Sequence, residues 1–132
     1  MFRIEGRFMQ EMVAHSREKA PNECCGILAG PPGQVAALYR TVNASASPIR
    51  YSIDPKEILR IAQEIEGKDW EMTAFYHSHT HSEAYPSATD IRLAFWPDSL
   101  YLIVSLADLQ QPCVRGFYLR GGQVTEEELE TF

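Results

Sequence analysis

The sequence predicts an α/β fold for the chain, on three observations. Two segments with helical periodicity, residues 8–20 and 54–67, alternate along the chain with short apolar runs that are typical of strands. Glycine and proline residues separate these runs where turns are needed. The length of 132 residues corresponds to one ordinary domain that buries a core without disulfide bonds, so we expect one domain over residues 1–132.

The first third of the chain is expected to form a helix and a hairpin. An apolar flank predicts a helix over residues 8–20, which Pro21 ends. The runs "CCGILAG" (24–30) and "QVAALYRTV" (34–42) are separated by "PPG", which predicts a turn between two strands.

The middle of the chain is expected to form a helix, a buried strand and a second, shorter helix. Asp54 can cap the first of these helices, and Gly67 can end it. The apolar run "MTAFYHSH" (72–79) predicts a buried strand that leads directly into a histidine-rich stretch. Ser87 can then cap a short helix over residues 88–95.

The last third is expected to add strands. "LYLIVSL" (100–106) is the strongest strand signal in the chain. "VRGFYLRGGQVTEE" (114–127) is typical of a hairpin that turns at Gly121-Gly122. The acidic "EEELE" (126–130) indicates a solvated tail or a frayed helix.

Composition and charge exclude several classes of partner. With 12 basic and 18 acidic residues, the chain offers no broad positive field for a nucleic acid. No apolar run approaches the roughly 20 residues of a membrane helix, and the first residues lack a signal-peptide stretch, so we expect a cytoplasmic protein. Three cysteines, two of them the adjacent Cys24 and Cys25, favour buried thiols over disulfide bonds.

The histidine-rich stretch "YHSHTHSEAYPSATD" (76–90) has the spacing of a metal site. His77 and His79 are two residues apart at the end of a strand, so both imidazoles point to one side. Asp90 lies three residues after Ser87, on the same edge of the helix that Ser87 caps. Two imidazoles and one carboxylate leave a fourth position free for water, which is the arrangement of catalytic zinc.

A hydrolytic zinc site also needs a group that carries a proton to the leaving amine. Glu23 and Glu83 are the two candidates. Glu83 is close to the histidines along the chain, whereas Glu23 opens the strand "ECCGILAG", which could pair beside His77.

Two other metal chemistries use part of this set of residues. In zinc nucleobase deaminases, His-x-Glu is followed by Pro-Cys-x-x-Cys. His81-Ser82-Glu83 and Pro112-Cys113 match the start of each part, but Gly116 stands where the second cysteine ligand is needed. Iron could also bind two histidines and one carboxylate, although this would leave Ser87 and Glu23 without roles.

The glutamate of "PNECCGILAG" followed by "HSHTHSEAYPSATD" resembles the JAMM (MPN-plus) metallopeptidase family. The resemblance extends through "TVNAS", "YSID" and the final "GGQVTEE" to the branch of bacterial sulfur-carrier-protein cysteine peptidases. It implies a mixed β-sheet flanked by helices, similar to the cytidine-deaminase fold.

The resemblance also implies roles for single residues. His77, His79 and Asp90 would bind Zn²⁺, Glu23 would be the general acid/base, and Ser87 would donate a hydrogen bond to the oxyanion at the scissile carbonyl. His81 lies outside this ligand set and is interpreted as a loop residue or as a contact of the ligands rather than a fourth ligand, since a fourth ligand would close the water position.

The activity implied is hydrolysis of the C-terminal amide of a ubiquitin-like sulfur carrier protein with a Gly-Gly tail, which releases cysteine for cysteine biosynthesis. Two alternatives remain. One is an isopeptidase that removes ubiquitin-like modifiers from lysine conjugates. The other is a non-catalytic scaffold that binds such partners. Few residues separate Asp90 from the strand at 100–106, which leaves little room for a ubiquitin-gripping insertion.

Overall fold

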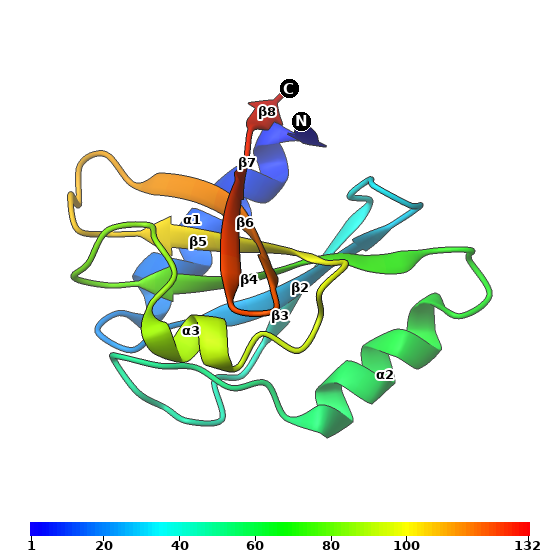
Figure 1. Cartoon of the computed structure of the whole chain (residues 1–132), viewed down its shortest axis with the longest axis horizontal. Helices are drawn as coiled ribbons and strands as arrows, with labels where there is room; N and C mark the ends of the chain where they lie inside the picture. Colours follow the sequence, from blue (N-terminus) through cyan, green and yellow to red (C-terminus); the bar gives the residue numbers. More distant parts are fainter.

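The computed structural model describes residues 1–132 and confirms the α/β fold with a mixed sheet (Figure 1). The main sheet has six strands in the order β3-β2-β4-β5-β6-β7, and only the β4–β5 pair is parallel. The strands are β2 (Cys25–Gly30), β3 (Ala37–Thr41), β4 (Glu71–His79), β5 (Leu100–Ser105), β6 (Cys113–Arg120) and β7 (Gln123–Glu127).

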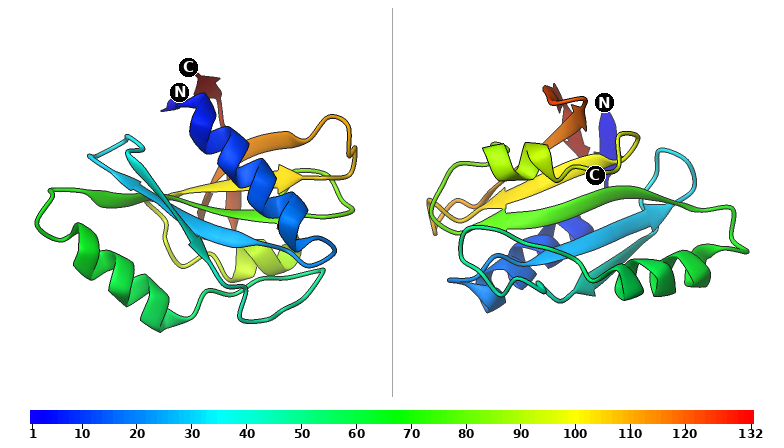
Figure 2. Two further views of the ribbon diagram at one scale, coloured as in Figure 1. Left: turned by 180° about the vertical axis from the view of Figure 1, so that it is seen from behind. Right: turned by 60° about the horizontal axis from the view of Figure 1, so that its bottom comes forward.

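Helices cover both faces of this sheet (Figure 2). α1 (Gly6–Lys19) packs on one face with Phe8 and Met12, against the side chains of β2, β4 and β5 that point to that side. α2 (Pro55–Ile65) and α3 (Ala88–Arg92) lie on the other face, where Ile61 joins a second buried cluster. None of the helices combines the length and the apolar character that crossing a membrane requires.

Several local predictions are confirmed. α2 begins at Pro55, and the side chain of Asp54 accepts a hydrogen bond from the Lys56 amide at 2.9 Å. β2 and β3 form the expected hairpin. The β6–β7 hairpin turns at Gly121 and Gly122. Their φ angles of 59° and 81° are positive, and glycine adopts such angles without strain.

The predicted boundaries of two helices, α1 and α3, are wrong. The helix predicted over residues 8–20 is α1, which begins at Gly6 and ends at Lys19. α3 was expected over residues 88–95 but ends at Arg92. The chain leaves the helix early because the Trp96 ring stacks on Phe75, with 5.4 Å between ring centroids, and the Trp96 amide donates to the Tyr101 hydroxyl at 3.1 Å.

The ends of the chain form a second sheet, which contradicts the expected acidic tail or frayed helix. β1 (Phe2–Ile4) pairs in parallel with β8 (Leu129–Thr131), and residues 126–127 belong to β7. Backbone amides of Phe2 and Gly6 donate to the carbonyls of Glu128 and Phe132, both at 2.8 Å. Burial of Phe2 and Ile4 against α1 stabilises this pairing.

The expectation of buried thiols is correct for two of the three cysteines. Cys24, directly before β2, and Cys25, its first residue, are buried, whereas Cys113 at the start of β6 is exposed. All three thiols are free.

Candidate metal centre

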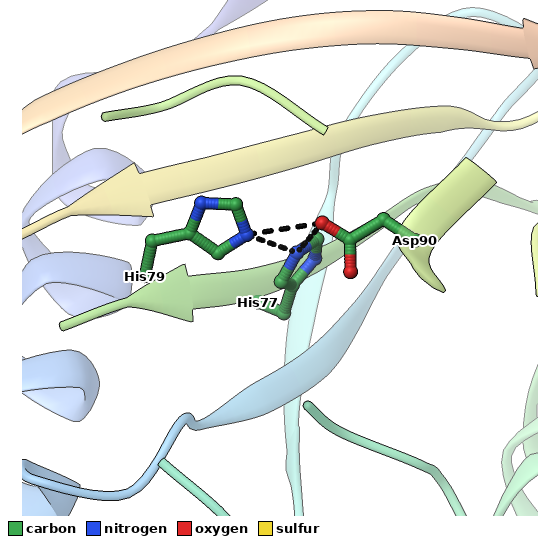
Figure 3. Close-up of side chains that lie close together, drawn as sticks. All are labelled: His77, His79 and Asp90. Carbon is green, nitrogen blue, oxygen red and sulfur yellow. Dashed lines mark hydrogen bonds and ion pairs between the residues drawn. The ribbon is translucent and has the colours of Figure 1, made fainter. Parts of the chain in front are cut away.

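Three buried side chains meet beside the end of β4. His77 and His79 point to the same face of the sheet, because successive residues of a strand alternate between faces. Asp90 reaches them from the first turn of α3 (Figure 3). The Nε2 atoms of His77 and His79 lie 3.1 and 3.0 Å from Asp90 Oδ2, and 3.2 Å from each other. These are the three residues predicted from spacing, and they form one cluster.

Ser87 positions Asp90 through a reciprocal cap. The Ser87 hydroxyl oxygen accepts a hydrogen bond from the Asp90 amide at 3.0 Å, and the Ser87 amide donates to Asp90 Oδ2 at 2.9 Å. Such a capping box satisfies two backbone donors at the start of a helix and orients the carboxylate. The prediction that Ser87 caps this helix is confirmed.

The geometry of the three side chains fits a zinc ion. Zn–N and Zn–O bonds of about 2.0–2.2 Å in a tetrahedron correspond to ligand–ligand distances of about 3.3–3.5 Å. The observed separations of 3.0–3.2 Å are slightly shorter and need only a small opening of the cluster.

The tautomer of His79 supports the same conclusion. Nδ1 of His79 donates to the Glu83 carbonyl at 2.8 Å, so a neutral His79 ring presents the Nε2 lone pair to Asp90. A lone pair and a carboxylate oxygen 3.0 Å apart repel each other unless a proton or a metal ion lies between them. The second nitrogen of a metal-binding histidine commonly makes this kind of bond to a carbonyl.

Burial and hydrogen bonding set the charges of the three side chains. Burial would raise the pKa of Asp90, but hydrogen bonds to His77 and His79 outweigh it and hold that pKa well below its ordinary range. Burial lowers the pKa of His77. Burial also acts to lower the pKa of His79, but its bonds to Asp90 and the Glu83 carbonyl raise it. A charged carboxylate and a neutral His77 are the forms that bind a metal.

Glu23 lies at the same end of the sheet, two residues before Cys25, the first residue of β2. The antiparallel pairing of β2 and β4 places Cys25 opposite His77, and the Ser78 amide donates to the Cys24 carbonyl at 3.1 Å. Only 4% of Glu23 is exposed, and its Oε1 atom has no hydrogen-bond partner. Burial raises the pKa of Glu23 to about 8, while nearby His79 lowers it and Asp90 raises it.

The other candidate proton carrier, Glu83, is exposed, and its contact with the cluster is through its backbone carbonyl. His81 is also exposed and lies outside the cluster, where its Nδ1 is 2.9 Å from the Thr80 hydroxyl. Of the two glutamates considered as proton carriers, Glu23 is therefore the one that is buried near the three metal ligands. Glu83 and His81 face solvent.

Tyr51 is a neighbour of the site that the sequence does not reveal. Its ring stacks on His77 with 4.3 Å between centroids and 19° between planes. Tyr51 also lines a pocket of about 150 Å³ beside Asp90, together with aromatic residues that include Phe75 and Trp96. Tyr51 lies in the segment before α2, where no periodic pattern indicates which way a side chain points.

The chain is similar to several known proteins. Residues 6–116 match the family of prokaryotic homologs of the JAB domain. The chain is 40% identical over 126 residues to a CysO-cysteine peptidase of Mycobacterium tuberculosis, covering 94% of this chain and 86% of that protein. It is 41% identical over 101 residues to a desampylase of Haloferax volcanii, covering 71% of this chain and 73% of that protein.

Solved structures are similar as well. The solution structure of a protein from Desulfitobacterium hafniense is 38% identical, with a TM-score of 0.90 over 100% of this chain and 93% of that one. A JAB1/MPN domain protein from Archaeoglobus fulgidus shares the fold, with a TM-score of 0.63 at 16% identity over 100% of this chain and 97% of that one.

Proposed function

The chain belongs to the JAB (JAMM/MPN) family, and on this basis we propose that residues 1–132 form one zinc metallopeptidase domain that acts on a ubiquitin-like sulfur carrier protein. The reaction is hydrolysis of the amide at the C-terminus of the carrier, after its Gly-Gly tail. It frees cysteine and serves cysteine biosynthesis. The similarity to a CysO-cysteine peptidase over most of both chains supports this choice of substrate. A cytoplasmic location stays a prediction.

One observation carries the proposal. The Nε2 atoms of His77 and His79 and the Oδ2 atom of Asp90 converge within 3.2 Å, next to a buried carboxyl, Glu23, that has an unpartnered oxygen. Three fixed ligands leave a position for substrate, as in catalytic rather than structural zinc sites. A scaffold without catalysis has no need of this combination.

His77, His79 and Asp90 would hold the zinc ion. When bound, zinc supplies Lewis-acid chemistry that activates water and polarises the scissile carbonyl. Glu23 takes one proton from the attacking water as the C–O bond forms, and gives it to the nitrogen as the C–N bond breaks. Glu23 thus ends in its starting state, and a pKa that burial raises to about 8 brings the group near the pH at which it can both accept and return a proton.

Ser87 can stabilise the oxyanion at the scissile carbonyl. Its oxygen already accepts from the Asp90 amide, and the hydroxyl donates no hydrogen bond within the protein. That hydrogen is available to the substrate on an exposed residue adjacent to the cluster. A hydrogen-bond donor that is already in position stabilises the transition state most strongly, because negative charge develops on the carbonyl oxygen there.

The test is release of cysteine from a purified carrier–cysteine adduct, measured with zinc and after chelation. We expect release that needs zinc and is abolished by Glu23→Gln, whereas Glu83→Gln, a substitution at the exposed glutamate, retains it. Release that persists in Glu23→Gln would refute the assignment of Glu23. A parent chain that binds no zinc would instead favour the scaffold.

A second candidate is the isopeptidase, favoured by the 41% identity to a desampylase. The same assay separates the two activities when it includes a carrier joined to a lysine side chain. Cleavage of the lysine conjugate without cleavage of the carrier–cysteine adduct would establish the isopeptidase.

A further inference from the structure

Ser105 is a buried polar residue at the end of β5 that the proposed reaction does not use. It is 4% exposed and lies opposite His79 in the parallel β4–β5 pairing. Its hydroxyl donates to the Ser82 carbonyl at 2.6 Å and accepts from the Ala107 amide at 3.2 Å. Both hydrogen-bonding roles of this hydroxyl are therefore occupied, one of them by the segment that follows the histidines.

That segment, residues 80–86, is held on the sheet on both sides of Glu83. Before it, the Ser82 carbonyl is bound by Ser105. After it, Ala84 is 3% exposed within the second buried cluster, and the Tyr85 ring packs edge-on against Phe117 with 5.4 Å between centroids. The Glu83 carbonyl lies between these anchors and accepts the Nδ1 proton of His79 at 2.8 Å.

We infer that Ser105 is a positioning residue of the metal centre, acting on His79 through the backbone of Ser82 and Glu83. The Ser105 hydroxyl holds the Ser82 carbonyl, which fixes the direction of the next carbonyl, that of Glu83. The Glu83 carbonyl keeps the proton of His79 on Nδ1 and turns Nε2 toward Asp90, the orientation seen in Figure 3. The inference rests on the zinc site of the proposed function.

Removal of the hydroxyl leaves the Ser82 carbonyl without its partner in the protein, although Ser82 itself is exposed and Ser105 is buried. The segment then loses its anchor before Glu83. The Glu83 carbonyl keeps the hydrogen bond from the Tyr85 amide at 2.9 Å, so the His79 ring is held less firmly in one orientation but is not released. Loss of a partner that orients a metal-binding histidine typically weakens metal affinity 10- to 100-fold. Because Ser105 acts one step further away, we expect the lower end, about tenfold.

The experiment measures zinc affinity by competition with a chromophoric chelator. Ser105→Ala is compared with Ser99→Ala, a matched control directly before the first residue of β5. Ser99 is 6% exposed and donates to the Met72 carbonyl at 2.8 Å, away from the histidines. We expect about tenfold weaker zinc binding in Ser105→Ala and a change of less than twofold in Ser99→Ala. An equal effect of the two substitutions would overturn the inference.

Two further measurements test the inference if Ser105→Ala folds poorly. Ser105→Thr and Ser105→Val have the same shape and differ in the hydroxyl, so only the threonine variant is expected to retain the parent affinity. Nitrogen-15 NMR of the histidine rings in metal-free protein is expected to show Nδ1 of His79 protonated and hydrogen-bonded in the parent and in Ser105→Thr, and protonated in only part of the molecules in Ser105→Val. An identical state of Nδ1 in all three proteins would overturn the role of Ser105, whereas absence of zinc binding by the parent would overturn the proposed function.

Discussion

Replacement of Glu23 with glutamine should abolish catalysis and yet stabilise the metal-free protein at alkaline pH. The carboxyl is 4% exposed, and one of its oxygens has no partner. Burial raises its pKa from an ordinary value of 4.5 to about 8. The folded protein therefore binds this proton more tightly than the unfolded chain. The resulting stabilisation is complete below pH 4.5 and is lost progressively as the pH rises to about 8.

The magnitude follows from the size of the shift. At about 1.4 kcal/mol per pH unit, a change from 4.5 to about 8 sets an upper limit of about 5 kcal/mol on the cost of the ionised carboxyl. Water that enters the metal-free site screens part of this cost. We therefore expect Glu23→Gln to exceed the parent in free energy of unfolding by about 2 kcal/mol at pH 8.5, and by nothing at pH 4.5.

Urea unfolding in the presence of a chelator, at pH 4.5, 6.5 and 8.5, measures this difference. The exposed Glu83→Gln is the control and should follow the parent at every pH. A Glu23→Gln protein that tracks the parent between pH 4.5 and 8.5 would show that Glu23 ionises freely in the folded state. The account of its burial would then be wrong.

The remaining predictions concern the metal, the oxyanion and the core. Zinc at a hundredfold excess over its dissociation constant should raise the free energy of unfolding by about 2.7 kcal/mol, measured by denaturation with and without chelator, because the unfolded chain does not assemble the three ligands. Ser87→Ala should lower kcat about 100-fold in the cysteine-release assay, because the oxyanion loses a donor, and an unchanged kcat would exclude that role. Gly26→Ala should lower the free energy of unfolding by about 1–3 kcal/mol in urea, because a Cβ atom there overlaps the buried Tyr76 ring. Gly67→Ala adds its methyl group to open space and serves as the control.

The strands and helices with strong periodicity were predictable, and the short or long-range pieces were not. The run at 100–106 is apolar throughout, so its burial follows from composition. β1 and β8 have three residues each, too few for a pattern, and they form only because the two ends of the chain pair in parallel. The early end of α3 depends on the stacking of Trp96 on Phe75, a contact that no local signal announces.

For the site, predictability followed the same division. The convergence of His77, His79 and Asp90 could be expected from the two-residue period of a strand and the cap at Ser87. The place of Glu23 depended on which strands pair, so the sequence left it open against Glu83. Tyr51 could not be assigned, because the path of its segment over His77 is set by the packing of the whole fold.

The parallel pairing of β1 with β8 brings the two ends of the chain together, as Figure 1 shows, and this makes the fold suitable for circular permutation. A short glycine-rich linker could join residue 132 to residue 1 without stretching either strand. New ends could then be opened at the turn around Gly33, where the backbone is exposed and a Cβ atom would meet nothing within 4 Å. In such a protein the three metal ligands would lie in the first half of the chain. β3 would be the first strand of the new chain and β2 would lie near its new end, so that the two strands would no longer be joined by a turn.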